Sequence, residues 1–144
     1  MNVLVDTSVW SLALRRKPQV LNAEQQLHVQ GLGELITEGR AKLIGLIRQE
    51  LLSGIKTVAQ FEKLREFLHA FRDEPVGTPD YETAARVGSD CRAKGIAVST
   101  VDMLICAVAL GHNLLVYTTD PDFKNYARVL PLKFHAVTEK PRRA

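Results

Sequence analysis

Four acidic residues stand beside apolar segments, where a charged side chain needs a physical reason. They are Asp6 after residues 2–5, Glu50 within residues 46–52, Asp102 before residues 103–107 and Asp120 after residues 114–119. Removing a carboxylate from water is costly unless a cation or hydrogen-bond donors compensate, and carboxylates brought together repel one another. The usual compensation for such a cluster is a hard divalent cation, which binds carboxylate oxygens. If the fold brings these acids together, they predict a metal site.

Each acid taken singly has a simpler interpretation. An Asp that follows a strand is a common turn or N-cap residue, and this reading is favoured for any single position. Glu50 alone would be a solvated residue on an amphipathic helix. The metal hypothesis gains weight because Asp6 and Asp120 both follow apolar runs and Asp102 begins a third element. In an open parallel sheet, ligands bind beyond the carboxyl ends of the strands, where such residues meet.

The elements that would position these acids alternate between strands and helices. Residues 3–5 are a short, fully apolar run, and residues 114–118 form a similar run rich in β-formers; both are typical of strands buried on both faces of a parallel sheet. Long helical patterns lie between them, which predicts an α/β fold with right-handed crossovers. Further short strands are expected at residues 41–44, 74–76 and 132–135 to complete the sheet.

Three helices are predicted from spacing and from end signals. Apolar residues recur at helical spacing over residues 58–71 and over residues 81–91, after the helix-starting Pro79. Gly95 fits the end of the second helix. Ser99 or Thr100 fits the N-cap of a third, which begins near residue 101 and is apolar nearly all round. That helix should be central, with Asp102 in its first turn, where the helix dipole favours negative charge.

Composition bounds the protein class. The chain has 144 residues and a formal charge of +3, enough for one domain with a real core and compatible with a polyanionic partner. The start lacks a secretory signal, and residues 103–110, the longest apolar segment, are too short to span a bilayer, so a cytoplasmic protein without membrane partners is expected. Cys91 and Cys106 fall in helical patterns and predict reduced, buried thiols.

Four blocks of sequence resemble the PIN-domain family, and within it the VapC-type toxins of toxin–antitoxin pairs. The blocks are residues 5–10 (VDTSVW), 50–54 (ELLSG), 102–107 (DMLICA) and 118–123 (TTDPDF), and the resemblance runs from residue 1 to about residue 133. It implies a three-layer α/β/α domain with a central parallel sheet over residues 1–135, followed by a short basic tail at residues 136–144. Cys106 stands where the family usually has a small residue such as Ala.

The same resemblance implies an activity and partners. It implies a ribonuclease dependent on Mg²⁺ or Mn²⁺, with Asp6, Glu50, Asp102 and Asp120 as its catalytic acidic quartet. Asp122 matches a further acid that is found in many members and counts with the quartet as a metal ligand; which of Asp120 and Asp122 contacts the metal stays open. The implied partners are an RNA substrate, a cognate VapB-type antitoxin and a second copy in a homodimer.

The residue types suit this chemistry. Divalent ions held by carboxylates lower the pKa of a bound water and neutralise charge on a phosphodiester, so no protein nucleophile is needed. Thr7 and Ser8 could donate to carboxylates or phosphate, but helix N-capping is at least as plausible, and Thr118 and Thr119 are open to the same two readings. Trp10, on the first predicted helix, could stack on a base, yet packing in the core is favoured.

Other interpretations of the sequence have less support. A haloacid-dehalogenase-like phosphatase also places Asp after the first strand, but it expects a second Asp two residues on, where this chain has Ser8. A degenerate PIN domain could act only as a binding module, although the complete quartet argues against it. Residues 31–36 begin like a dinucleotide fingerprint but end in Ile36 within a helical pattern, a chance match. The histidines are scattered, which favours surface or capping roles.

Control by a partner is also expected. The resemblance implies an antitoxin segment lying over the active site, and an Arg guanidinium suits an acidic pocket because it binds carboxylates bidentately. Apolar anchors of that segment are expected in a groove beside the first helices, near Trp10 and Leu14.

Overall fold

A parallel sheet of three short strands forms the centre of the molecule. The structure, a computed structural model, describes residues 1–137. Strand β1 (Val3–Val5) lies between β2 (Ala41–Lys42) and β3 (Leu115–Tyr117), and all pairings are parallel. Val3 is paired with Ala41 on one side and with Leu115 on the other. The predicted strand at residues 3–5 is therefore confirmed, and the run at 114–118 contains β3.

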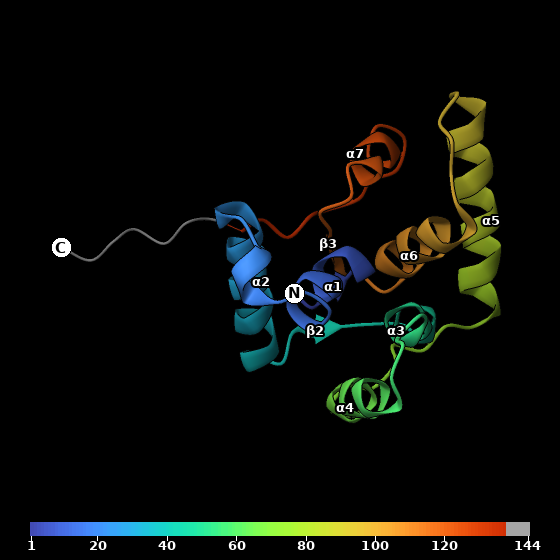
Figure 1. Cartoon of the computed structure of the whole chain (residues 1–144). Helices are drawn as coiled ribbons and strands as arrows, with labels where there is room; N and C mark the ends of the chain where they lie inside the picture. Colours follow the sequence, from blue (N-terminus) through green and yellow to red (C-terminus); the bar gives the residue numbers. More distant parts are fainter. Residues whose placement is uncertain (138–144) are drawn as a thin grey trace.

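Helices connect and cover the strands. Their bounds are α1 (Thr7–Leu14), a 3-10 turn (Pro18–Val20), α2 (Ala23–Thr37), α3 (Gly45–Leu52), α4 (Val58–Leu68), α5 (Thr78–Ala93), α6 (Thr100–Gly111) and α7 (Asp122–Tyr126). In Figure 1, α2 lies on one side of the strands, and α6 and α5 lie on the other. The expected three-layer α/β/α arrangement with a parallel sheet is confirmed.

Two of the predicted strands are wrong, and a third is shorter than expected. Residues 74–76 and 132–135 form no strand. A single bridge joins Leu43 to Asp73, just before the first segment, and another joins Val116 to Phe134 in the second. Each segment contains or follows a proline, Pro75 or Pro131, which has no N–H to donate to a ladder. The strand expected at residues 41–44 is limited to β2.

The core is built on α6, as its apolar sequence predicts. Its residues 103–109 are all buried, and Cys106 on α6 and Cys91 on α5 are free buried thiols. Trp10 on α1 is fully buried, donates its indole N–H to the carbonyl of Val5 at 3.0 Å and packs edge-to-face on Phe71 at 5.2 Å. The core role of Trp10 is confirmed, and the expected partner groove near Trp10 and Leu14 stays a prediction, in which Trp10 itself is too buried to make a direct contact.

The helix ends follow the predicted signals. Ser99 is the N-cap of α6, and its hydroxyl accepts from the backbone N–H of Asp102 at 3.1 Å. Gly95 follows α5 with φ of 76°, a left-handed conformation that suits glycine. Helix α4 ends at Leu68, short of Phe71. Within residues 1–137 no helix is long and apolar enough to cross a membrane.

The expected boundary between domain and tail at residue 135 stays a prediction. Most of the tail, residues 138–144, lies outside the described residues.

Candidate active site

Asp6 lies at the carboxyl end of β1 and is the N-cap residue of α1. Its side chain is 7% exposed. One carboxylate oxygen, Oδ2, accepts hydrogen bonds from the hydroxyls of Ser8 and Thr118, both at 2.8 Å. Because two donors share one oxygen, the carboxylate is held in a fixed orientation beside the ends of β1 and β3.

Glu50, on α3, faces the same region. Its Oε1 accepts from the Thr7 hydroxyl at 3.1 Å, across 43 residues of chain. Burial is the main cause of a raised pKa of Glu50, the Thr7 hydrogen bond opposes it, and the charges of Asp6 and Asp102 add to it. The simple reading of Glu50 as an isolated solvated residue does not hold, because other carboxylates act on it.

Asp102, in the first turn of α6, accepts a hydrogen bond from a residue 24 positions further along the chain. The Tyr126 hydroxyl on α7 donates to Asp102 Oδ2 at 2.6 Å. Burial raises the pKa of Asp102 most, this hydrogen bond lowers it, and the charges of Asp6 and Asp120 raise it further. Burial, together with the same contact, moves the pKa of Tyr126 well above its usual range, so the phenol stays protonated as a donor.

Asp120 and Asp122 complete the cluster. Asp120 follows β3, and its Oδ1 accepts from the backbone N–H of Asp122 at 2.9 Å. Carboxylate oxygens of Asp102, Asp120 and Asp122 lie within 4.8 Å of one another. The fold therefore places Asp102, Asp120 and Asp122 together, with Asp6 and Glu50 near enough to act on their charge.

The donor set fits a hard divalent cation. Among residues 1–137, no Lys or Arg forms an ion pair with any of these five carboxylates. The side chains that donate hydrogen bonds to these carboxylates are neutral hydroxyls, so they do not offset the negative charge; they belong to Thr7, Ser8, Thr118 and Tyr126. Clustered carboxylate oxygens without a protein counter-ion are the ligands that Mg²⁺ and Mn²⁺ take.

The structure also settles the roles of residues around the acids. Thr7 and Ser8, for which two readings were open, donate to carboxylates, and α1 has no side-chain cap. The Thr118 hydroxyl both donates to Asp6 and accepts from the N–H of Asp120 at 3.0 Å. Tyr126 was missed, and nothing in its neighbourhood of sequence signals a role, since only the fold brings α7 to the start of α6.

Comparisons with known proteins define the family. The sequence model of the PIN domain matches residues 3–129, and the chain belongs to the PIN-domain family. A search of curated protein sequences gives no match.

Solved structures resemble nearly the whole chain. FitAcB from Neisseria gonorrhoeae has 27% identity and a TM-score of 0.72, with 92% of this chain and 96% of that chain covered. VapBC2 from Rickettsia felis, bound to a promoter DNA fragment, has 17% identity and a TM-score of 0.70, with 94% and 98% covered. VapBC-5 from Mycobacterium tuberculosis, a member of the VapBC family of toxin–antitoxin systems, has 21% identity and a TM-score of 0.65, with 92% and 96% covered.

Proposed function

We propose that this chain is a VapC-type toxin, an endoribonuclease of a toxin–antitoxin pair that hydrolyses RNA phosphodiester bonds with Mg²⁺ or Mn²⁺. The observation that carries the proposal is the convergence of Asp102, Asp120 and Asp122 within 4.8 Å, beside Asp6 and Glu50, in a PIN domain. The likeness to FitAcB and to the VapBC structures supports the toxin part.

The chain's own residues hold and orient the proposed site. Its metal ligands are Asp6, Glu50, Asp102, Asp120 and Asp122. A divalent ion there supplies charge to offset that of the phosphodiester and a water of lowered pKa. Ser8 and Thr118 fix the Asp6 carboxylate, Thr7 fixes Glu50 and Tyr126 fixes Asp102. Hydrogen bonds to ligating carboxylates set their orientation and are part of such a site.

The rival functions have less support. In a haloacid-dehalogenase-like phosphatase the residue two after the first Asp would be a second carboxylate, whereas Ser8 here donates a hydrogen bond to Asp6. A PIN domain that only binds other molecules would not need five carboxylates to share one region against their mutual repulsion.

The test of the nuclease is a pair of near-isosteric variants. Asp6→Asn and Asp102→Asn should each lower Mg²⁺-dependent RNA cleavage by at least about 100-fold, because one charged ligand is lost, while the melting temperature in EDTA stays close to wild type. Asp90→Asn, an exposed acid on α5, is the matched control and should cleave normally. RNA ends mapped by sequencing after controlled expression would identify the cut sites. Wild-type rates from either site variant would refute the assignment.

The proposed partner is a VapB-type antitoxin that inhibits by covering the acidic site with a basic side chain. An apolar groove beside α1 and α2 is available for its anchors, lined by residues that include Leu12, Ala13, Leu21 and Leu27. This groove lies beside the first helices, where the anchors were expected, although Trp10 itself does not line it. Co-expression with the neighbouring small open reading frame should yield a complex that cleaves RNA at least about 100-fold more slowly than the free toxin in excess Mg²⁺. A fully active complex would contradict this mode of control.

The remaining parts of the proposal are a homodimer and a cytoplasmic location. A mass of twice that of one chain, measured by light scattering on the free toxin, is the expected result for the dimer.

A further inference from the structure

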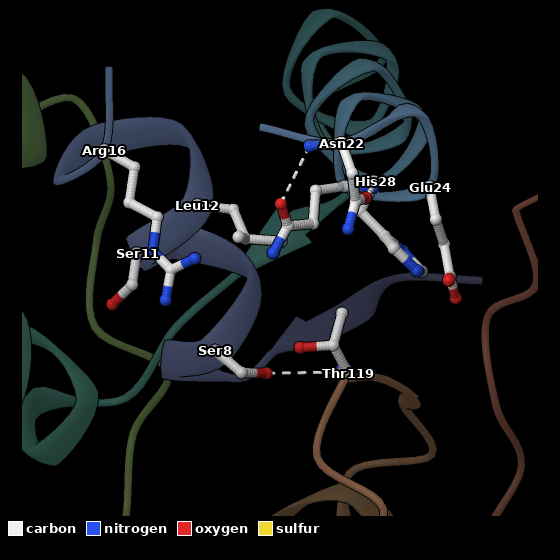
Figure 2. A pocket seen from close by; sticks show the side chains of 9 residues that line it. Ser8, Ser11, Leu12, Arg16, Asn22, Glu24, His28 and Thr119 are labelled. Carbon is white, nitrogen blue, oxygen red and sulfur yellow. Dashed lines mark hydrogen bonds between the residues drawn. The ribbon is translucent and has the colours of Figure 1, made fainter. Parts of the chain in front are cut away.

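A polar pocket lies directly beside the acidic site. It has a volume of about 400 Å³, within the range of about 300–1,000 Å³ typical of small-ligand sites. Figure 2 shows its walls: Ser11 and Arg16 lie on the α1 side, Asn22 and His28 on the α2 side, and Ser8 and Thr119 face each other across its base. Gln25 of α2 also lines it.

The pocket and the acidic site share a wall. The Ser8 hydroxyl donates to Asp6 Oδ2 at 2.8 Å and accepts from the backbone N–H of Thr119 at 3.1 Å. Thr119 directly precedes Asp120. A phosphodiester at the carboxylates would therefore place the next nucleotide at the mouth of this pocket. Arg16, whose guanidinium forms no ion pair within residues 1–137, offers a positive charge for an adjacent phosphate.

The start of α2 fixes the orientation of two side-chain amides. Asn22 Oδ1 accepts from the backbone N–H of Gln25 at 2.8 Å, and Gln25 Oε1 accepts from the backbone N–H of Asn22 at 3.0 Å. This reciprocal capping box engages both amide oxygens. Each amide therefore has its NH₂ group left to offer a ligand, so both residues present hydrogen-bond donors.

His28 presents an acceptor. The Tyr117 hydroxyl donates its single proton to the carbonyl of His28 at 2.8 Å. The contact of 3.0 Å between the same hydroxyl and His28 Nδ1 then requires Nδ1 to carry the proton. In the neutral ring, Nε2 is left with its lone pair. Glu24, on the rim of the pocket, is a second acceptor.

This pattern matches one pair of nucleobases. Guanine and uracil carry a carbonyl oxygen next to a ring N–H, so they need a donor beside an acceptor. Adenine and cytosine carry an amino group next to an unprotonated ring nitrogen, the reverse pattern. Single-stranded RNA exposes these edges to protein side chains. We propose that the pocket between α1 and the start of α2 holds the base next to the scissile phosphate and selects guanine or uracil over adenine and cytosine, which rests on the ribonuclease function proposed above.

Two variants reverse the donors without removing the helix cap. Asn22→Asp and Gln25→Glu keep the capping oxygens and replace each NH₂ group by an oxygen, so their melting temperatures should match wild type. Gln30→Glu makes the same chemical change at an exposed position of α2 outside this pocket, and controls for added negative charge.

The experiment has a binding arm and a cleavage arm. Fluorescent RNA tetramers that differ at one base are titrated by anisotropy in EDTA, where no cleavage occurs, and a randomised RNA is cleaved in Mg²⁺ and sequenced. Wild type and Gln30→Glu should prefer guanine or uracil at one fixed position by roughly tenfold, the size expected for a hydrogen-bonded base contact. Asn22→Asp and Gln25→Glu should lose or reverse that preference.

The two arms separate the inference from the nuclease assignment. A guanine or uracil preference in binding without any cleavage would support the pocket and reject the nuclease. Cleavage without base preference, or an equal loss at all four bases in the pocket variants and in Gln30→Glu, would overturn the pocket. Variants that change affinity for the antitoxin but leave RNA preference intact would also overturn it, because the pocket would then serve a protein partner.

Discussion

At the residue scale, burial and mutual repulsion control the protonation of Glu50 and Asp102. Both pKa values are raised in the folded chain, so folding favours the protonated carboxyl groups. Without metal, this contribution to stability is fully present below the ordinary pKa values of 4.5 and 3.8 and is lost as pH rises through the raised values. A bound cation reverses the balance because it favours the ionised forms.

Divalent metal should therefore raise the melting temperature at neutral pH and raise it less in acid. At tenfold excess over its dissociation constant, Mg²⁺ or Mn²⁺ would contribute about 1.4 kcal/mol, or roughly 3–6 °C for a chain of this size. Thermal unfolding at pH 7.5 and pH 5, with and without metal, measures this. Asp102→Asn should remove most of the shift and Asp90→Asn should keep it. A melting temperature insensitive to metal at saturating concentrations would contradict the proposed ligands.

The sequence predicted which acidic residues meet better than it predicted the residues that donate hydrogen bonds to them. Asp6, Asp102 and Asp120 each flank an element whose apolar pattern identifies it, so the topology of a parallel sheet predicts that they meet. Tyr126 lies 24 residues from Asp102, and its role depends on how α7 returns to α6. No local pattern encodes that contact. The choice between capping and carboxylate contact for Thr7 and Ser8 likewise needed the fold.

At the element scale, two glycines of α2 differ in whether the surrounding structure leaves room for a side chain. A Cβ on Gly31 would lie 2.8 Å from Val137 Cγ2 and 2.9 Å from the Tyr117 hydroxyl oxygen. That hydroxyl is hydrogen-bonded to His28, so moving it away from α2 would weaken or break these hydrogen bonds. A Cβ on Gly33 would meet nothing within 4 Å. Of the two glycines that resembled part of a dinucleotide fingerprint, Gly31 is thus required by packing, whereas no contact requires Gly33.

The matched substitutions follow from this difference. Gly31→Ala should destabilise the fold by about 1–3 kcal/mol through overpacking. Gly33→Ala should stabilise it by about 0.5–1 kcal/mol, because alanine loses less backbone entropy in an exposed helix interior. Urea unfolding of both variants at one pH measures the difference. Equal effects of the two substitutions would show that the close approach of Tyr117 to α2 does not limit this position.

Periodicity located the long elements and misjudged the short ones. Helices α4, α5 and α6 fall within or close to the predicted ranges because each spans several turns. Residues 74–76 and 132–135 offer too few side chains for a pattern. Beside Pro75 and Pro131, pairing is limited to the single bridges of Asp73 and Phe134. Where these two segments lie depends on contacts with Leu43 and Val116, which are distant in sequence and so do not appear in a local sequence pattern.

At the scale of the whole molecule, His112 joins three segments at the end of α6 that is opposite to Asp102. As the C-cap residue of α6, it contacts Glu74 Oε1 through Nδ1 and Asp80 Oδ1 through Nε2, each at 3.0 Å. Asp80 also accepts from the backbone N–H of Gly77 at 2.9 Å, which caps α5. The sequence favoured a surface or capping role for the histidines. The structure adds that His112 connects the end of α6 to Glu74 and to Asp80 of α5.

Both contacts of His112 can be donated only by the protonated ring, since a neutral imidazole has one N–H. The hydrogen bond to Glu74 is the main cause of its raised pKa, burial opposes the shift, and Asp80 adds to it. A raised folded pKa means that the contribution to stability is fully present below the ordinary value of 6.5 and is lost as pH rises through the folded value.

Replacing His112 should therefore matter more in mild acid than in mild base. At pH 6, His112→Gln should lower the free energy of unfolding by on the order of 1–3 kcal/mol, as expected for hydrogen bonds between charged groups, and the loss should shrink at pH 9. His69→Gln, at the exposed C-cap of α4, should show no such trend. Chemical unfolding at several pH values in EDTA isolates the effect from metal binding. A loss that is the same at pH 6 and pH 9 would mean that His112 stabilises the junction by packing, with no contribution from its charge.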